Sequence, residues 1–155
     1  MRFLRNLGLW LRPLQMTDPD FGNLVFMHMD RHPERSYWEA EWNFPATNKV
    51  VVITIRGGED GPRPEVRQFY LGLPARFDSI LSACRPQLDG VFRHWRGEYL
   101  PADVFSVIEL GGFGVEDPLE DPVKWDISFE TRDGKWLGIL IPFVGDKAME
   151  AVVDT

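Results

Sequence analysis

The sequence predicts an α+β fold, in which an antiparallel meander sheet of about six or seven strands packs in two layers against a kinked helix or a pair of helices. Short runs of β-branched and aromatic residues, separated by turns rich in Gly, Pro, Asn and Asp, are typical of consecutive strands. Between these runs, apolar residues recur every three or four positions over residues 66–95, which is the helical period. Strands and helices in separate blocks favour the α+β class.

The length of 155 residues predicts a single domain, residues 1–155, because no repeat or low-complexity linker divides the chain. Aromatic residues make up 13% of the sequence, which argues against an intrinsically disordered chain. No apolar run approaches the roughly 18 residues that a membrane-spanning helix needs. We therefore expect a globular domain that does not span a membrane.

Three strands are expected in the first half, over residues 24–29, 36–44 and 49–56. The second of these alternates between apolar and polar residues, as a half-buried antiparallel strand does. Its predicted core side consists of Trp38, Ala40, Trp42 and Phe44. The third is almost entirely β-branched, which suits a central strand.

The helical stripe of residues 66–95 contains two prolines, Pro74 and Pro86. Proline removes an amide donor and crowds the preceding turn. The stripe is therefore expected to form one kinked helix or two to three shorter helices. The single cysteine, Cys84, lies on the apolar face, which favours a core thiol over a nucleophile.

Further strands are expected over residues 104–110, 125–131 and 135–141, with an edge strand over residues 149–154. Arg132-Asp-Gly134 separates the second and third, and Asp-Gly suits a tight hairpin turn. In residues 125–131 we expect the side chains at 125, 127 and 129 to face the helices. The intervening polar side chains would then face solvent.

The charge is concentrated in one segment. The chain has 17 basic and 24 acidic residues, a net charge of −7, so non-specific nucleic-acid binding is not expected. Residues 98–121 contain no Lys or Arg and have seven acids: Glu98, Asp103, Glu109, Glu116, Asp117, Glu120 and Asp121. The remainder of the chain is close to neutral. A single-sign segment favours solubility and attracts partners of opposite charge.

Cys84 cannot form an internal disulfide, so a reduced, cytoplasmic setting is the expectation. The first 15 residues have three arginines and no acid, and their apolar stretch is too short for a signal peptide. On a helix, one face would carry Leu4, Leu7, Trp10, Leu11 and Leu14. This stripe is a candidate dimer contact, and the chain is expected to be a monomer or a homodimer.

Metal and cofactor sites are not expected. With three histidines and one cysteine, a structural zinc site is effectively excluded. His28 and Asp30 could share a strand side and meet Glu39 or Glu41 on a neighbouring strand, but a polar row facing solvent is the simpler interpretation. His94 is interpreted as a cation near a helix C-terminus, which the helix dipole favours.

Motifs for catalysis are equally weak, and no catalytic residue is assigned. No serine lies in a nucleophile elbow. The carboxylate pairs Glu39/Glu41 and Asp126/Glu130 each share a strand face, as exposed strands often do. The glycine-rich residues 57–61 lack the Lys-Ser/Thr ending of a phosphate loop. We interpret them as a turn followed by acids at a helix start, and residues 111–114 lack a following helix.

Aromatic residues are abundant for a two-layer core of this size. Four tryptophans stand out in the strand regions: Trp38, Trp42, Trp125 and Trp136. Most are expected in the core, where large rings contribute much of the buried area. Aromatic residues on a concave sheet face rimmed by acids would instead indicate a protein-recognition surface.

Several short motifs together resemble a family of small uncharacterised bacterial proteins, a domain family of unknown function. In chain order they are Asp20-Phe-Gly22, Tyr37-Trp-Glu-Ala-Glu41, Gly61-Pro62, Gln68-Phe-Tyr70 and Trp125-Asp-Ile-Ser-Phe-Glu130. Similar small acidic α+β proteins often act as immunity proteins against secreted bacterial toxins. The resemblance therefore implies toxin neutralisation, and it assigns no catalytic residue.

The first functional hypothesis is accordingly a non-enzymatic protein-binding domain that occludes a basic toxin through an acidic surface. The expected partner-binding residues are Glu98, Asp103, Glu116, Asp117, Glu120 and Asp121. One alternative is a small ligand-binding or hydrolytic domain that uses the solvent face of the sheet, with His28, Glu39 and Glu41. Another is a structural domain that oligomerises through its N-terminal apolar stripe.

Overall fold

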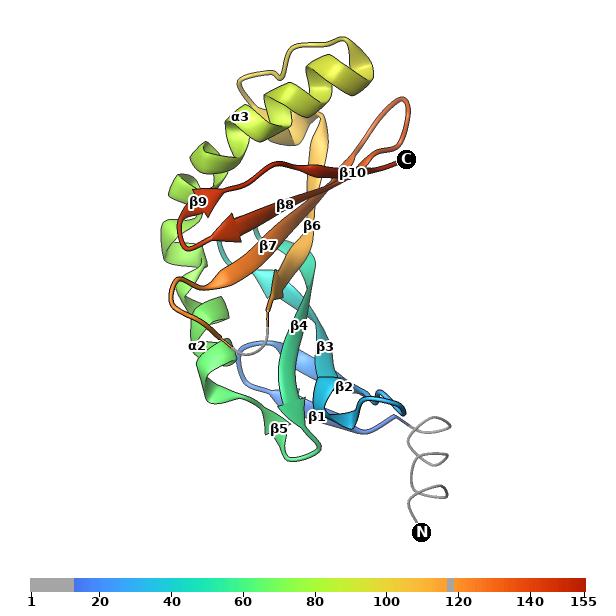
Figure 1. Ribbon diagram of the computed structural model, residues 1–155, viewed down its shortest axis with the longest axis vertical. Coiled ribbons are helices and arrows are strands. Elements are labelled where there is room, and N and C mark those ends of the chain that lie inside the picture. The colour runs from blue at the N-terminus through green and yellow to red at the C-terminus, as the bar shows by residue number, and fades with distance from the viewer. Residues whose placement is uncertain (1–12, 117–118) are drawn as a thin grey trace. The chain divides into compact units, whose positions relative to one another are not determined.

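The computed structural model describes residues 13–116 and 119–155, and it confirms the α+β class (Figure 1). The chain divides into two compact units, with the boundary between Gly72 and Leu73. The elements of the first unit are β1 (Gln15–Asp18), β2 (Gly22–Met27), the 3-10 turn η1 (Pro33–Arg35), β3 (Tyr37–Phe44), β4 (Lys49–Gly58), β5 (Gly61–Pro62) and α2 (Pro64–Gly72).

The first unit is an antiparallel meander in the order β1-β2-β3-β4, with β5 paired to the end of β4. The expected core side of β3 is confirmed, because all four of its side chains are buried. Helix α2 packs against β4, where the Tyr70 hydroxyl donates to the Thr54 carbonyl at 2.6 Å. That bond gives the hydroxyl of the buried Tyr70 side chain a hydrogen-bond partner.

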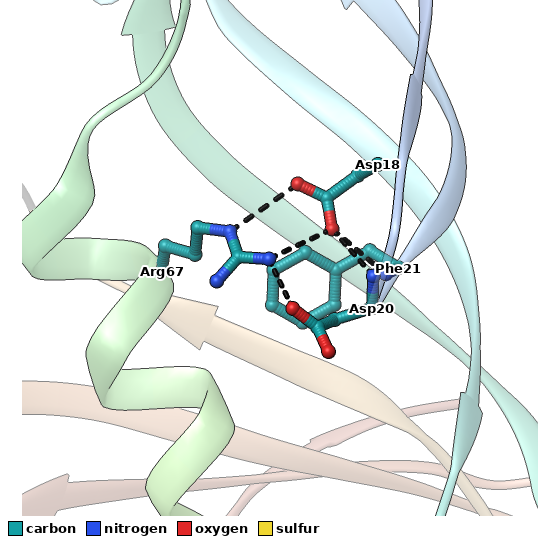
Figure 2. A network of polar contacts seen from close by, with 4 residues as sticks. All are labelled: Asp18, Asp20, Phe21 and Arg67. Atoms are coloured by element: carbon teal, nitrogen blue, oxygen red, sulfur yellow. Dashed lines mark hydrogen bonds and ion pairs between the residues drawn. The ribbon is translucent and has the colours of Figure 1, made fainter.

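The β1–β2 turn is held by a polar network (Figure 2). The Asp18 carboxylate accepts from the backbone N–H groups of Asp20 and Phe21 at 2.8 and 3.1 Å, which closes the turn from within. Arg67 of α2 donates to both oxygens of Asp18 at 3.1 and 3.2 Å, and also to Asp20. Its guanidinium carbon lies 5.4 Å from the centroid of the Phe21 ring. One arginine thus joins the turn to the helix.

The β4–β5 hairpin differs from the expectation that the acids of residues 57–61 lie at the start of a helix. Glu59 and Asp60 form the turn of this hairpin, whereas the acid in the first turn of α2 is Glu65. The hairpin closes tightly because a Cβ on Gly57 would lie 2.2 Å from the Gly61 carbonyl oxygen. Gly61 has a φ of +129°, which side-chain-bearing residues rarely adopt. Glycine at these two positions therefore allows two backbone segments to lie close together.

The second unit contains the long helix and the remaining strands. Its elements are the 3-10 turn η2 (Pro74–Arg76), α3 (Phe77–Arg96), the 3-10 turn η3 (Val104–Ser106), β6 (Ile108–Val115), β7 (Lys124–Thr131), β8 (Gly138–Val144), β9 (Lys147–Ala148) and β10 (Val152–Asp154). The sheet has the antiparallel order β6-β7-β8-β10, with β9 paired to the end of β8.

The predicted helical stripe is confirmed as two helices separated by η2, with Pro74 at the start of that turn. Pro86 lies inside α3 without ending it. Helix α3 ends at Gly97, which has a φ of +65° and donates its N–H to the Arg93 carbonyl at 3.2 Å. This is the glycine C-cap expected after a helix. His94 lies in the last turn with two arginines, as predicted.

Two predicted strands begin later than expected. Residues 104–106 form η3 because the Asp103 carboxylate accepts from the Phe105 N–H at 3.2 Å and caps a turn there. Strand β6 then runs through the glycine-rich residues 111–114, so these residues belong to a strand and not to a phosphate loop. Strand β8 starts at Gly138, because the Thr131 hydroxyl accepts from the Leu137 N–H at 2.8 Å and closes a longer loop.

Three of the four tryptophans in the strand regions lie in the core. The indole N–H groups of Trp38 and Trp125 donate to the carbonyls of Gly58 and Gly145 at 2.9 and 2.8 Å, and Trp42 is buried as well. The alternation predicted for residues 125–131 is also confirmed. Trp136 differs, because 47% of it is exposed.

The described residues contain ten strands, more than the six or seven predicted. The excess comes from short strands such as β1, β5 and β9, which have four, two and two residues. Within the described ranges, no helix has both the length and the apolarity to cross a membrane. The N-terminal apolar stripe falls outside the described residues except for Leu14.

Candidate functional site

The β6–β7 connection and the start of β7 carry the group of carboxylates that we call the acidic cluster: Glu116, Glu120, Asp121 and Asp126. Val115 of β6 pairs with Trp125 of β7, and beyond this pair Glu116 donates its N–H to the Lys124 carbonyl at 3.0 Å. The hairpin therefore continues one step past β6 and brings Glu116 beside β7. The side chains of Glu116, Glu120 and Asp121 are exposed to solvent.

Asp126 is the half-buried member of the acidic cluster. Its partner in β6 is Gly114, where an added Cβ would lie 2.9 Å from a carboxylate oxygen of Asp126. The glycine thus leaves room for this carboxylate over the backbone of β6. Burial raises the pKa of Asp126, the charge of Glu116 raises it further, and a hydrogen bond from the Gly114 N–H lowers it in part. Negative charge is therefore costly at this position.

Lys124 is the one cation among the described residues of the connection. Its ammonium lies 3.7 Å from a carboxylate oxygen of Glu120, and both side chains are about half exposed. Such an exposed pair contributes at most about 1 kcal/mol to stability. Four carboxylates against one ammonium leave the acidic cluster with an excess of negative charge.

Glu98 and Asp103 lie apart from the acidic cluster. Glu98 follows the end of α3 and lies 3.5 Å from the Arg96 guanidinium, while Asp103 caps η3 just before β6 begins. Strand β6 has eight residues, so its two ends are roughly 23 Å apart at about 3.3 Å per residue. Glu116 and Glu120 both lie beside Lys124, and Asp121 follows Glu120 in the same connection. Glu98 and Asp103 precede β6, so this strand separates them in the chain from Glu116. Asp117 lies outside the described residues.

A shallow hollow of about 400 Å³ lies beside the Glu98–Asp103 loop, between it and α3. The Arg85 guanidinium crosses this hollow and donates to the carbonyls of Pro101 and Ala102 at 2.6 and 3.2 Å. Asp89 accepts from the Leu100 N–H at 3.4 Å. These polar groups fix the loop to the helix, which explains their presence without a ligand.

The alternative site on the sheet face of the first unit is not assembled. The His28 ring follows the buried side of β2, with 11% of its side chain exposed and its centroid 6.2 Å from that of Phe26. Glu39 and Glu41 belong to the other face of β3, because the residues between and beside them are buried. The expectation that His28 could meet these carboxylates is therefore wrong. No group of three metal-ligating side chains occurs in the part of the chain that the structure describes.

The remaining candidates for chemistry have structural roles. Cys84 is fully buried in α3, and burial raises its pKa to about 12, as expected for a core thiol. Asp126 and Glu130 are four residues apart on β7, roughly 13 Å along a strand, so they cannot share a proton.

Sequence reasoning missed two features of these surfaces. It assigned no role to the pairing of Gly114 with Asp126, because a glycine between strand residues gives no signal of what it accommodates. It also missed the contact of Arg67 with Asp18, which are 49 residues apart. Comparison with known proteins finds no matching family model, no matching curated protein and no matching solved structure.

Proposed function

We propose that this chain is a non-enzymatic binding protein, a bacterial immunity protein that neutralises a basic toxin. In this proposal the acidic cluster enters the polyanion-binding cleft of the toxin and blocks it. The setting is the cytoplasm, where the single thiol Cys84 remains reduced. The observation that carries the proposal is the excess of exposed carboxylates at the β6–β7 connection.

The charge distribution supports a basic partner. All seven charges of residues 98–121 are negative, and the acidic cluster collects part of this charge at one end of a hairpin. Clustered charge of one sign raises the rate at which an oppositely charged protein is captured.

The raised pKa of Asp126 also supports a basic partner. Its pKa is raised by burial and then by the nearby charge of Glu116. A lysine or arginine from a partner, placed between these two carboxylates, would offset that repulsion and favour the ionised form. Binding of a basic surface would therefore relieve an unfavourable interaction that exists in the free protein.

Affinity capture with the purified chain as bait tests the proposal at about 50 and about 300 mM salt, because salt screens attraction between exposed charges. The proposal requires a captured protein that is basic, is released at the higher salt, and is toxic when produced alone in a bacterial cell. Co-production of the chain should then restore growth. A variant with Glu116→Lys, Glu120→Lys and Asp121→Lys should fail to restore it.

The matched control reverses three exposed acids of the first unit, Glu41→Lys, Asp60→Lys and Glu65→Lys, which gives the same net charge. This control should protect the cell as the wild type does. Equal loss of protection in both variants would mean that overall charge, and not the acidic cluster, governs binding. A captured partner that is acidic, or that is not toxic, would contradict the immunity function.

A further inference from the structure

The outer face of the sheet in the second unit carries three large apolar side chains that are exposed, which we call the outer patch: Trp136, Leu140 and Val152. Their exposed fractions are 47%, 37% and 60%. Leu140 and Val152 are direct partners in the β8–β10 register, so their side chains lie next to each other. The buried side chains of β8 face the opposite side of the sheet. The outer patch is therefore an apolar surface on the solvent side of this sheet.

Two carboxylates lie in one row beside the outer patch. Glu130 of β7 and Asp154 of β10 are the two register partners of Gly138, and both side chains are exposed. A Cβ on Gly138 would lie 3.0 Å from the Trp136 ring, so the indole lies over the bare backbone of this glycine. Because neighbouring strands are about 4.8 Å apart, the backbones of Glu130 and Asp154 are roughly 10 Å apart. The outer patch thus has a carboxylate on each side of Trp136.

The chain itself contains a segment of complementary chemistry, residues 2–12, which we call the N-terminal segment. Its sequence has three arginines and no acid. At helical spacing it presents the N-terminal apolar stripe on one side, a pattern typical of a helix that lies on an apolar surface. Arg5 and Arg12 are seven residues apart, so on a helix they follow the same border of this stripe, about 10.5 Å apart along the axis. The segment therefore combines an apolar side with two cations of fixed spacing.

The spacing of these two arginines matches the spacing of the two carboxylates. A helix that lies across β7, β8 and β10 can place Arg5 over one carboxylate and Arg12 over the other, at about 10 Å in both cases. Leu140 and Val152 lie two residues further along their strands, about 7 Å from the row of carboxylates, where the apolar stripe would lie. All these groups face the same side of the sheet, so one helix can contact them together. The apolar stems of the arginines would also pack on Trp136.

We propose that two copies of this chain form a dimer in which the N-terminal segment of each copy lies as a helix on the outer patch of the other. Pro13 alone separates this segment from Leu14, whose carbonyl accepts from the Phe26 N–H at 2.8 Å in the first unit. The segment thus extends from one unit, while the outer patch belongs to the other. Each copy has one segment and one patch, so a two-fold arrangement makes the same contact twice. Making it twice brings the buried area towards the roughly 1,200–2,000 Å² of a stable interface.

This inference does not rest on the immunity function. The outer patch lies beside Glu130, and the exposed acids of the acidic cluster lie at the Lys124 end of β7, roughly 20 Å away along the strand at about 3.3 Å per residue. Charges this far apart are largely screened at physiological salt, where the screening length is about 8 Å. The variant with Glu116→Lys, Glu120→Lys and Asp121→Lys should therefore keep a dimer dissociation constant within about twofold of the wild type.

Sedimentation equilibrium of the full chain over a concentration series tests the proposal. The wild type should sediment as a dimer whose dissociation constant rises with salt, because salt screens exposed charge pairs. Leu140→Lys and Val152→Lys should each weaken the dimer by about tenfold or more, as loss of an interface anchor does. Val50→Lys is the matched control, because Val50 is 61% exposed on β4, and its dissociation constant should stay within about twofold of the wild type. Urea denaturation shows that each variant is folded.

A charge exchange tests the pairing of arginines with carboxylates. One chain has Arg5→Glu and Arg12→Glu, and a second chain has Glu130→Arg and Asp154→Arg. Each chain alone should be a monomer at concentrations where the wild type is a dimer, because like charges then face each other in both contacts. In a mixture, the reversed segment meets the reversed patch, and the unchanged segment meets the unchanged patch. The mixture should therefore form a one-to-one dimer with a dissociation constant within about threefold of the wild type.

Several results would overturn the proposal. A wild type that remains a monomer at all concentrations would exclude it, and so would a dimer that survives both substitutions in the outer patch. If the two reversed chains do not associate when mixed, the arginines and the carboxylates are not partners. Arg31→Glu with Lys49→Glu changes the net charge equally at two exposed cations of the first unit, so loss of the dimer there would mean that net charge governs association. None of these results depends on toxin binding, so the two proposals can fail independently.

Discussion

Arg67 and Asp18 form a two-pronged ion pair that connects α2 to the β1–β2 turn. The Nε and Nη2 atoms of Arg67 donate to the two carboxylate oxygens of Asp18 at 3.2 and 3.1 Å. Asp18 has 11% of its side chain exposed and Arg67 has 23%. A parallel pair of charge-assisted hydrogen bonds in a partly buried place is stronger than an ordinary surface ion pair.

Replacing Arg67 with alanine should destabilise the fold. We expect Arg67→Ala to lower the free energy of unfolding by about 1–3 kcal/mol, because Asp18 is left half-buried without its partner. Arg67→Lys should recover part of the loss, since an ammonium cannot bind both oxygens as a guanidinium does. Urea denaturation at pH 7 measures both effects. Arg31→Ala, at an exposed loop position, is the control and should unfold as the wild type does.

The ion pair of Arg67 and Asp18 also predicts how the free energy of unfolding depends on pH. Burial raises the pKa of Asp18, but the hydrogen bonds from Arg67 and from two backbone N–H groups lower it below 3.8 overall. Its stabilisation is therefore complete above pH 3.8 and is lost as the pH falls through the lower value in the folded state. The difference in unfolding free energy between wild type and Arg67→Ala should shrink below about pH 3.8. A difference that stays constant down to pH 2 would refute this role for Asp18.

The β4–β5 hairpin predicts a contrast between two adjacent glycines. A Cβ at Gly57 would lie 2.2 Å from the Gly61 carbonyl oxygen, whereas a Cβ at Gly58 meets nothing within 4 Å. Gly57→Ala should therefore lower the free energy of unfolding by about 1–3 kcal/mol, as overpacking against backbone does. Gly58→Ala should be close to neutral. Thermal and urea denaturation of the two variants test the hairpin geometry, and equal stabilities would show that it is wrong.

Removal of the charge on Asp126 should stabilise the free protein at neutral pH. Burial, and then the charge of Glu116, raises the pKa of Asp126 above 3.8. The ionised form therefore costs stability at pH values above the folded-state pKa, and this cost disappears as the pH falls towards 3.8. Asp126→Asn should raise the free energy of unfolding at pH 7, with a smaller gain near pH 4. Glu116→Gln should act in the same direction with a smaller effect, and destabilisation by either variant at pH 7 would contradict this interpretation.

Much of the fold follows from local patterns in the sequence. The alternation from Trp38 to Phe44 identified a strand and its core side, and the helical period placed Cys84 in the core. The errors concern strand starts and short strands. One hydrogen bond, from the Phe105 N–H to the Asp103 carboxylate, holds residues 104–106 in a turn. The spacing of apolar residues does not predict such a bond.

The candidate site was predicted less completely, because it depends on contacts between distant residues. The charge run of residues 98–121 includes the β6–β7 connection. Grouping all its acids as one surface overlooked the strand between Asp103 and Glu116, which is roughly 23 Å long at about 3.3 Å per residue. The sequence does not show that His28 lies on the opposite sheet face from Glu39 and Glu41. Which residues of two strands share a face depends on the register of their pairing. Trp136 was expected on a strand and instead lies on the surface before β8.

The central claim is that the acidic cluster captures a basic protein. The most direct measurement is the association rate constant of the captured toxin at several salt concentrations, for the wild type and for the variant with Glu116→Lys, Glu120→Lys and Asp121→Lys. The account predicts a rate that falls with salt for the wild type, and a slower rate with little salt dependence for the variant. The charge-matched control at Glu41, Asp60 and Glu65 should retain most of the wild-type rate. Equal association rates for wild type and cluster variant at low salt would contradict the account.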